Sequence, residues 1–198
     1  MEKVLIATLY SADPVLLAAN RLGPDKLILL IDKEPSEEQQ KSLKLIKESL
    51  GRVIQVEAVK TEVYNIVDVA AKAVEIIDAQ AKDAQIFINV TSGRKTKAIG
   101  LLFGAYARID RVKKIGYNPE EKTEVVYLPK MSFKLTESQK KILEALEKGE
   151  FKSPLDLAGK VKLSRAMLYR NIDELKDMGY VDTEEGIKLT DAGKIARL

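Results

Sequence analysis

The chain has 198 residues, a length that suits one large or two small domains, and 45% of them are hydrophobic, which is enough for an ordinary core. Its net charge of +3 is too small to require or to exclude a nucleic-acid partner. The absence of cysteine excludes disulfides and thiol chemistry. The absence of histidine removes the commonest general base, and without either residue a zinc site is improbable. We therefore expect no metal and no cofactor.

Composition and the N-terminal segment also bear on where the protein works. Charged residues reach 32%, with Lys and Glu prominent, which is typical of thermophile proteins. Residues 1–10 (MEKVLIATLY) are too short and too soon polar for a signal peptide, and no apolar run approaches the length that crosses a membrane. We therefore expect a cytoplasmic protein without a membrane partner.

Strand-like and helix-like segments alternate over residues 1–130. The alternation predicts an α/β fold with right-handed crossovers and a mainly parallel, Rossmann-like sheet with helices on both faces. The turn at 118–122 favours an antiparallel hairpin that closes the sheet. Strands are expected at 3–8, 26–31, 53–59, 86–90, 112–117 and 123–128, and helices after Asp13-Pro14, at 36–50, at 62–81 and after the turn 91–97.

The turn after the fourth strand has the properties of an anion site. Thr91 or Ser92 is expected to cap the helix that follows. The free N–H groups and the dipole of a helix start favour negative charge. Residues 93–97 (GRKTK) add positive charge beside a glycine that permits close backbone approach. The turn therefore indicates a phosphate ligand, and the alternative is a solvated basic helix start.

The familiar phosphate motifs do not fit this turn. A P-loop joins Gly directly to Lys and needs a further glycine upstream, whereas here Arg94 separates Gly93 from Lys95. The dinucleotide fingerprint belongs in the first strand–helix turn, which has no glycine, and the kinase signatures are missing. Ligands bind at the carboxyl ends of parallel strands, so loops 8–13 and 91–97 face one pocket if their strands are neighbours.

After Pro129 the pattern changes to short helices. Helices are expected at 135–146, at 154–161 with Ser153 as the cap, after Ser164 and after Thr190, with a hairpin of strands 180–182 and 187–189 before the last one. Three helices and a hairpin are the order of a winged helix-turn-helix, whose third helix reads the major groove. The predicted domains are therefore 1–130 and 131–198.

This order of elements, together with the fourth-strand loop N-V-T-S-G-R-K at 89–95, resembles the CRISPR-associated Rossmann-fold (CARF) proteins. The resemblance covers the whole chain, with residues 1–130 similar to the CARF domain and residues 131–198 similar to the second half of archaeal CARF–helix-turn-helix proteins. It implies a homodimer whose two fourth-strand loops together bind a cyclic oligoadenylate. The ligand is typically cyclic tetra-adenylate, made by type III CRISPR complexes.

The residues expected to bind this ligand come from two loops. Arg94 and Lys95 would form ion pairs with phosphates. An adenine would need a stacking partner, for which Tyr10 is a candidate. Ser92 and the backbone of Gly93 would donate to phosphate, and Ser11 would reach a ribose or a phosphate. The alternative for Tyr10 and Ser11 is a plain connecting loop. The full set is Thr8, Tyr10, Ser11, Thr91, Ser92, Gly93, Arg94 and Lys95.

Two functions remain open. In the first, the protein is a ligand-controlled transcription regulator, and Ser164, Arg165, Tyr169 and Arg170 face double-stranded DNA. The alternative for Arg165 and Tyr169 is that they flank the core stripe of their helix. A less favoured variant is a nucleotide-binding regulator outside CRISPR defence.

In the second function, the CARF domain cuts the ring. Some CARF ring nucleases carry a serine after the first strand and an Arg-Lys pair after the fourth, which Ser11, Arg94 and Lys95 match. Without a metal, the ligand's own 2′-hydroxyl would attack the adjacent phosphate and leave linear products with a 2′,3′-cyclic phosphate. The cationic pair would stabilise the developing charge, and the winged helix would serve dimerisation.

The charges of the second half argue against DNA binding. From Met131 onward there are 13 Lys or Arg against 12 Asp or Glu, a net of +1. A DNA-binding module usually presents a basic face, and the acidic wing tip Glu184-Glu185 would repel phosphate. Regulation stays slightly ahead because the order of elements in this half is complete.

Overall fold

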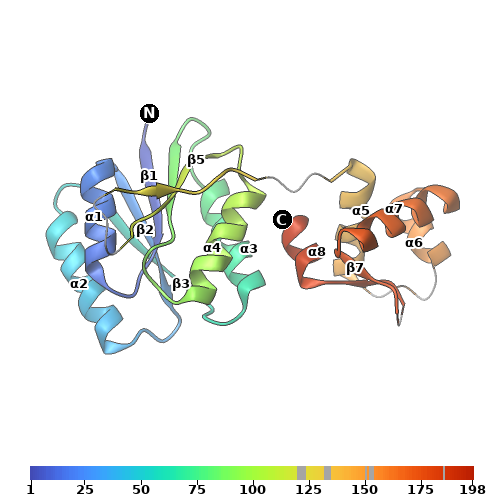
Figure 1. Cartoon of the computed structure of the whole chain (residues 1–198), viewed down its shortest axis with the longest axis horizontal. Coiled ribbons are helices and arrows are strands. Elements are labelled where there is room, and N and C mark those ends of the chain that lie inside the picture. The colour runs from blue at the N-terminus through green and yellow to red at the C-terminus, as the bar shows by residue number, and fades with distance from the viewer. Residues whose placement is uncertain (120–123, 132–134, 150, 152–153, 185) are drawn as a thin grey trace. The chain divides into compact units, whose positions relative to one another are not determined.

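The structure, a computed structural model, describes residues 1–119, 124–131, 135–149, 151, 154–184 and 186–198. The chain divides into two units, Met1–Ser132 and Phe133–Leu198 (Figure 1). Among the described residues, no helix is long and apolar enough to cross a membrane.

A six-stranded sheet organises the first unit, in the order β3-β2-β1-β4-β5-β6. The first five strands are parallel and β6 pairs antiparallel with β5, as the sequence predicts. The strand order reverses between β1 and β4, where ligands of such sheets bind. The strands are β1 Lys3–Thr8, β2 Lys26–Asp32, β3 Gln55–Thr61, β4 Gln85–Asn89, β5 Val112–Tyr117 and β6 Val126–Tyr127.

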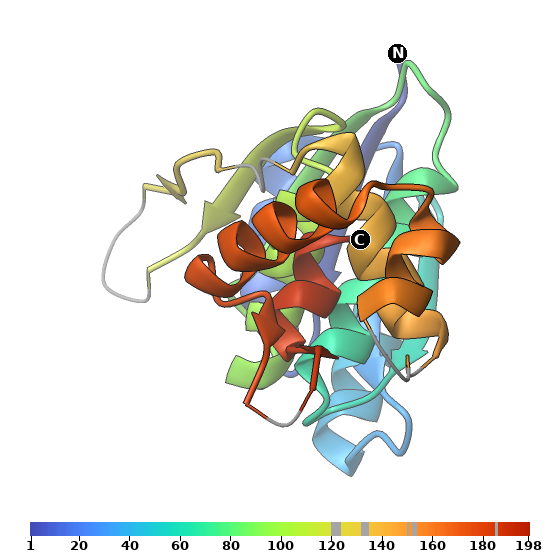
Figure 2. The same ribbon diagram turned by 90° about the vertical axis from the view of Figure 1, so that its right-hand side faces the viewer.

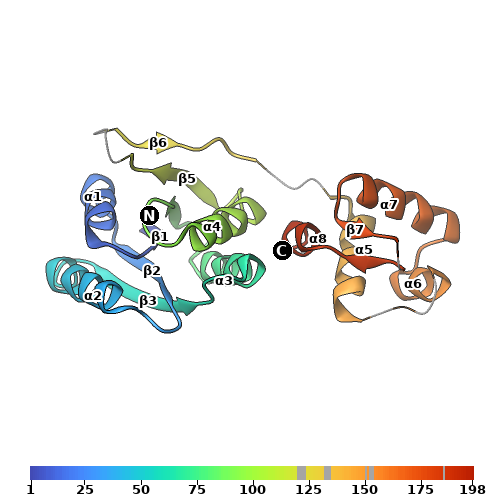
Figure 3. The ribbon, with the colours of Figure 1, turned by 60° about the horizontal axis from the view of Figure 1, so that its bottom comes forward.

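Helices cover both faces of this sheet. Helices α1 and α2 lie on one face, and α3 and α4 lie on the other (Figure 3). Strands β1 and β2 are therefore buried on both sides, which explains their continuous apolar runs. The helices are α1 Ala12–Leu22, α2 Glu37–Leu50, α3 Ile66–Asp78 and α4 Lys95–Ala107.

Several helix starts differ from the prediction. Helix α3 begins at Ile66 instead of 62, because the Asn65 side chain accepts from the backbone N–H of Asp68 and caps it. Helix α1 has Ser11 at its N-cap, so that the expected start signal at 13–14 lies inside its first turn. The sixth strand is shorter than expected, and residues 120–123 of the predicted turn and strand lie outside the described residues.

Helices α3 and α4 pack very closely. A Cβ at Gly100 would lie 2.6 Å from the Val69 Cβ, and one at Gly104 would lie 2.6 Å from both the Ala70 carbonyl oxygen and the Ala73 Cβ. Contacts below 3.0 Å force a shift, so glycine is required on this face of α4. The spacing of the two glycines in the sequence favours a packing role over a ligand role and leaves open whether they pack within the subunit or across a dimer; in the structure they pack against α3 of the same chain.

The second unit has the predicted order of helices and strands (Figure 2). Thr136, Ser164 and Thr190 cap their helices through their side chains. Helix starts after Ser164 and Thr190 were expected from the sequence, whereas α5 was expected to begin at 135. Ser153 lies outside the described residues. The elements are α5 Glu137–Lys148, α6 Pro154–Val161, α7 Arg165–Asp177, β7 Val181–Asp182, β8 Lys188–Leu189 and α8 Asp191–Ala196.

Candidate functional site

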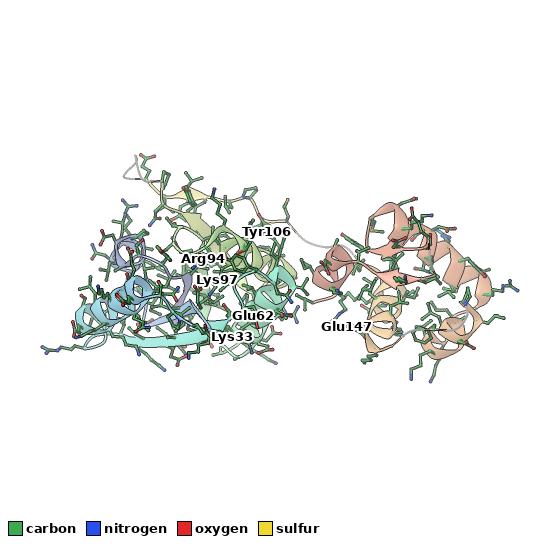
Figure 4. All side chains as sticks on the ribbon, turned by 90° about the horizontal axis from the view of Figure 1, so that it is seen from below. Lys33, Glu62, Arg94, Lys97, Tyr106 and Glu147 are labelled. Atoms are coloured by element: carbon green, nitrogen blue, oxygen red, sulfur yellow. The ribbon has the colours of Figure 1, made fainter. Side chains whose placement is uncertain are left out.

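The loops that follow β1 to β5 gather at the carboxyl edge of the first unit's sheet. The parallel strands run from top to bottom in Figure 1, so that Figure 4 looks onto this edge. Strands β1 and β4 are direct neighbours, which brings loops 8–13 and 91–97 together as expected. Three adjoining hollows open here. The basic hollow is lined by Tyr10, Tyr64 and 93–96. The β1–β5 hollow is lined by Tyr10, Ser11, Asp13, Pro14, Leu17, 91–93 and 117–119. The acidic hollow is lined by 32–34, 62–65, Asp68 and Arg94.

Hydrogen bonds tie the β1 and β4 loops to each other. The Thr8 hydroxyl donates to the Ser92 carbonyl. The Ser92 hydroxyl accepts from the backbone N–H groups of Tyr10 at 2.9 Å and Ser11 at 3.2 Å, and it donates to the Ser11 carbonyl at 3.1 Å. Both side chains are buried. Thr8 and Ser92 therefore position the two loops, and the single hydroxyl proton of Ser92 is given to the Ser11 carbonyl. Their contact with a ligand stays a prediction.

Gly93 and Thr91 complete this framework. Gly93 has φ +92, and a Cβ there would lie 2.7 Å from the Thr8 Cβ, so both the backbone conformation and the space require glycine. Thr91 accepts from the backbone N–H of Asn118 at 2.7 Å and thereby attaches the loop after β5. Neither Thr91 nor Ser92 caps α4, because the helix begins later, at Lys95.

The start of α4 has no side-chain cap, and Arg94 occupies its N-cap position. The first N–H groups of this helix therefore lack a capping acceptor from that residue, and they face the edge where Lys95 is exposed. Lys95 forms no ion pair with any described residue. Arg94 lies 6.0 Å from the ring centre of Tyr10, which is about one third exposed. This combination retains the properties of an anion site.

Lys97 does not belong to the exposed cations, contrary to expectation. Its side chain is fully buried, and its ammonium donates to Asp32 Oδ1 at 2.5 Å. Arg94, whose side chain is 42% exposed, donates to the other carboxylate oxygen through Nε at 3.3 Å. Figure 4 shows Arg94 and Lys97 next to each other. Two cations of the basic turn thus hold a carboxylate at the end of β2.

Burial and charge act in opposite directions on this buried pair. Burial alone would raise the pKa of Asp32, but the hydrogen bonds and charges of Lys97 and Arg94 outweigh it and keep that pKa below its ordinary value of 3.8. Burial lowers the pKa of Lys97 from its ordinary value, against the opposing effect of Asp32. The lowered pKa of Asp32 favours its ionised form beside the Lys97 ammonium.

Three residues of this edge escaped the sequence analysis. Asp32 directly follows the apolar run of β2. A charged residue at the carboxyl end of a parallel strand is a signal for a site residue that the sequence itself contains. Gln39 is buried, accepts from the Asp32 N–H at 3.0 Å and donates to the Leu9 carbonyl at 2.6 Å, so that it joins the loops after β1 and β2. Tyr64 was placed inside a predicted helix, but it lies in the exposed loop before α3.

The four residues expected to face DNA are exposed in the second unit. Ser164 caps α7 through the backbone N–H of Met167, and the Arg165 guanidinium lies 5.6 Å from the ring centre of Tyr169. Arg170 forms an ion pair of 3.1 Å with Glu174 on the same helix. Leu168, Ile172 and Leu175 form the buried core stripe of α7, and the exposed residues lie outside it. Of the wing tip, Glu184 is described and residue 185 is not.

Acidic residues at the carboxyl edge do not form a metal site. Asp32, Glu34, Glu62 and Asp68 line one hollow. Within the described ranges, however, no three His, Cys, Asp or Glu side chains are grouped so as to hold a metal ion.

Two family models match the chain. One, described as HFX_2341_N-like, N-terminal, matches residues 3–122, and the other, a winged helix-turn-helix DNA-binding model, matches residues 135–182. No curated protein matches the chain in sequence.

Solved structures share the fold at low identity. Can2 from Sulfobacillus thermosulfidooxidans, in complex with cyclic tetra-adenylate, has a TM-score of 0.53 at 12% identity, over 98% of this chain and 63% of its own. Csm6 from Enterococcus italicus, bound to cyclic hexa-2′-fluoro-hexa-dAMP, has a TM-score of 0.53 at 18% identity, over 92% of this chain and 56% of its own. Protein VC1899 from Vibrio cholerae has a TM-score of 0.53 at 10% identity, over 98% and 64%.

These matches concern the fold and its extent. The chain spans about three fifths of the length of these three proteins. The resemblance to the CARF fold, followed by a winged helix-turn-helix, is confirmed at the level of architecture.

Proposed function

The chain belongs to the family described as HFX_2341_N-like, N-terminal, and from this premise we propose that it senses a cyclic oligoadenylate in type III CRISPR defence. The observation that carries the proposal is the start of α4, where Lys95 and the partly exposed Arg94 stand beside uncapped backbone N–H groups at the switch point of the sheet. Two solved proteins of the same fold hold cyclic oligonucleotides, which supports this class of ligand. Cyclic tetra-adenylate is the ring we favour.

A homodimer is part of the proposal. A ring of four equal nucleotides has approximate two-fold symmetry, and an isologous dimer presents the same loop twice around a two-fold axis. Each subunit would then contribute Arg94 and Lys95 to phosphates on its own half of the ring. Thr8, Thr91 and Ser92 would hold these loops in place, and Tyr10 and Ser11 would line the ring's path along the β1–β5 hollow.

The output of the sensor is assigned to the winged helix. Residues 135–182 match a DNA-binding family model, and Ser164, Arg165, Tyr169 and Arg170 are exposed on or beside α7. We propose that this unit binds double-stranded DNA and that ligand binding changes its affinity. The internal ion pair of Arg170 with Glu174 leaves Arg165 as the stronger candidate for a phosphate or base contact.

Binding of labelled cyclic tetra-adenylate tests the ligand. We expect that Arg94→Ala and Lys95→Ala each weaken binding at least about tenfold, because each removes a charge-assisted hydrogen bond to phosphate. The matched control is Lys82→Ala, which removes an exposed lysine from the loop that precedes β4, at the opposite edge of the sheet. A wild-type chain that binds neither cyclic tetra-adenylate nor cyclic hexa-adenylate refutes the proposal.

The same incubation examines the ring-nuclease alternative. Linear products that form without metal and disappear in the Ser11→Ala and Lys95→Ala variants would make the protein a ring nuclease. Ser11 lines the β1–β5 hollow, and its hydroxyl does not cap α1. If the bound ring stays intact, the ring-nuclease alternative is refuted and the sensor proposal stands.

Binding to DNA from the protein's own promoter tests the output. We expect salt-sensitive binding that the ligand alters and that Arg165→Ala weakens. A lack of binding at low salt, both with and without ligand, would end the regulator proposal while leaving ligand sensing intact.

A further inference from the structure

The acidic hollow lies directly beside the basic start of α4, at the carboxyl ends of β2 and β3. It has a volume of about 750 Å³, and four acidic side chains line it against two basic ones, Lys33 and Arg94. Lys33 is engaged by Glu62, and Arg94 by Asp32. Figure 4 labels Lys33, Glu62 and Arg94 at this edge. The excess of negative charge repels phosphate, so whatever part of a ligand enters here is not its phosphate.

Tyr64 stands between the acidic hollow and the basic hollow and lines both. It is 76% exposed, an unusual position for a large aromatic side chain on a well-fixed loop. The loop is fixed because the Thr96 hydroxyl, in the first turn of α4, donates to the Val63 carbonyl at 2.6 Å. The Asn65 cap of α3 holds the other side of Tyr64. The ring is therefore held on a fixed loop beside the anion site without being covered by protein.

Arg94 links this tyrosine to the anion site. Arg94 donates a hydrogen bond to Asp32, which raises the pKa of Arg94 above its ordinary value, and Arg94 lines both hollows together with Tyr64. On its other side Arg94 approaches the Tyr10 ring. The guanidinium of Arg94 and the rings of Tyr10 and Tyr64 thus line one hollow. Such a lining suits the flat face of a nucleobase, because aromatic rings and guanidinium planes both stack on bases.

We propose that Tyr64 and the acidic hollow form a nucleobase subsite, which binds one adenine of a cyclic oligoadenylate by its ring face. This inference rests on the proposed function and adds to it the residue that holds the base. An adenine is uncharged and carries an exocyclic amino group, a donor that matches free carboxylate acceptors. Glu34 and Asp68 supply such acceptors, since neither forms an ion pair with a described residue. The phosphates stay with Arg94 and Lys95, outside the negative wall.

Affinity for cyclic tetra-adenylate tests the stacking. Tyr64→Ala is expected to weaken binding about tenfold or more, as loss of a base-stacking ring does, and Tyr64→Phe is expected to keep the wild-type affinity because the ring remains. Tyr127→Ala is the matched control: Tyr127 is an exposed tyrosine of the same unit on β6, over Lys114, and its loss leaves binding unchanged. Equal affinity of Tyr64→Ala and the wild type overturns the inference.

A second ring tests the acidic wall. Cyclic tetra-inosinate replaces the amino group by a carbonyl oxygen, which the carboxylates repel, so the wild type is expected to prefer the adenine ring about tenfold or more. The double variant Glu34→Gln, Asp68→Asn is expected to lose most of this preference. A wild type that binds both rings equally overturns the role of the wall. A wild-type chain that binds neither ring refutes the proposed function itself. A wild-type chain that binds the adenine ring, together with a Tyr64 variant of equal affinity, refutes only the subsite.

Discussion

Lys97 illustrates how one residue changes the chemistry of a site without touching a ligand. In the sequence it follows two cations and adds to a basic turn, whereas in the structure its fully buried ammonium holds the Asp32 carboxylate. Removing one partner of a buried ion pair leaves the other charge uncompensated. The pair therefore matters more to the stability of the carboxyl edge than to its net charge.

Replacing Lys97 by Met is expected to lower the free energy of unfolding by about 3–5 kcal/mol, because Asp32 remains buried with only the exposed Arg94 beside it. The double variant Asp32→Asn, Lys97→Met is expected to recover much of this loss, since no buried charge is left. Urea unfolding followed by circular dichroism measures both. Equal stability of wild type and Lys97→Met would show that the pair carries no such weight.

The pH dependence of unfolding reports on the same carboxylate. The pKa of Asp32 is lower in the folded chain than its ordinary value of 3.8, despite its burial, because of Lys97 and Arg94. Its contribution to stability is therefore complete above that ordinary value and is lost as the pH falls through the lower, folded value. Below about pH 4 the wild type is expected to lose stability more steeply than the double variant. Parallel pH profiles of the two would contradict this assignment.

At the scale of elements, packing against α3 fixes α4, the helix whose start forms the proposed anion site. Gly100 and Gly104 bring the two helices into backbone contact, and Thr96 joins the first turn of α4 to the loop before α3. Tyr64, on that loop, therefore moves with α4. The glycine face of α4 is thus part of the site's framework, although it lies away from the hollows.

Gly104→Ala is expected to destabilise the first unit by about 1–3 kcal/mol, because the added Cβ meets the Ala70 carbonyl oxygen and the Ala73 Cβ, each 2.6 Å away. Gly159 in α6 is the matched control: a Cβ there meets nothing within 4 Å, so Gly159→Ala is expected to stabilise the second unit by up to about 1 kcal/mol. Thermal unfolding distinguishes the two. A shift of the same sign for both would refute the packing role.

Elements with local causes were predictable from the sequence. The strands β1 and β2 follow from unbroken apolar runs, and α2, α5, α7 and α8 start at the caps Ser36, Thr136, Ser164 and Thr190. The loops after β1 and β4 were expected to face one pocket if the two strands were neighbours, and the two strands do pair with each other.

The parts that could not be predicted depend on long-range pairing. Asp32 and Lys97 are 65 residues apart, and a lysine in the first turn of a helix gives no sign that it is buried. Ser92 contacts residues 81 to 84 positions away. The prediction placed Tyr64 inside the third helix, because Val63 and Ile66 continue a helical apolar pattern on both sides of the Asn65 cap.

At the scale of the molecule, the proposed dimer makes a prediction about stoichiometry. If two chains share one ring, calorimetric titration with cyclic tetra-adenylate is expected to saturate at about one ring for two chains. Sedimentation of the ligand-bound protein is expected to give twice the 22.1 kDa mass of the chain. Saturation at one ring per chain, in a particle of single mass, would contradict the shared site.

The two oxygens of Asp32 have different partners, and this has a consequence for how long a ligand stays. Because Lys97 holds Oδ1 while Arg94 holds Oδ2, Arg94 could turn toward a phosphate and Asp32 would still keep its buried partner. The carboxylate is thus a built-in competitor for the guanidinium. Because the carboxylate competes for Arg94, an anion needs a higher concentration to bind the guanidinium, and Arg94 would return to Asp32 when the anion leaves. In the proposed sensor, this competition would weaken the hold on the ring's phosphates and so favour early release of the ring.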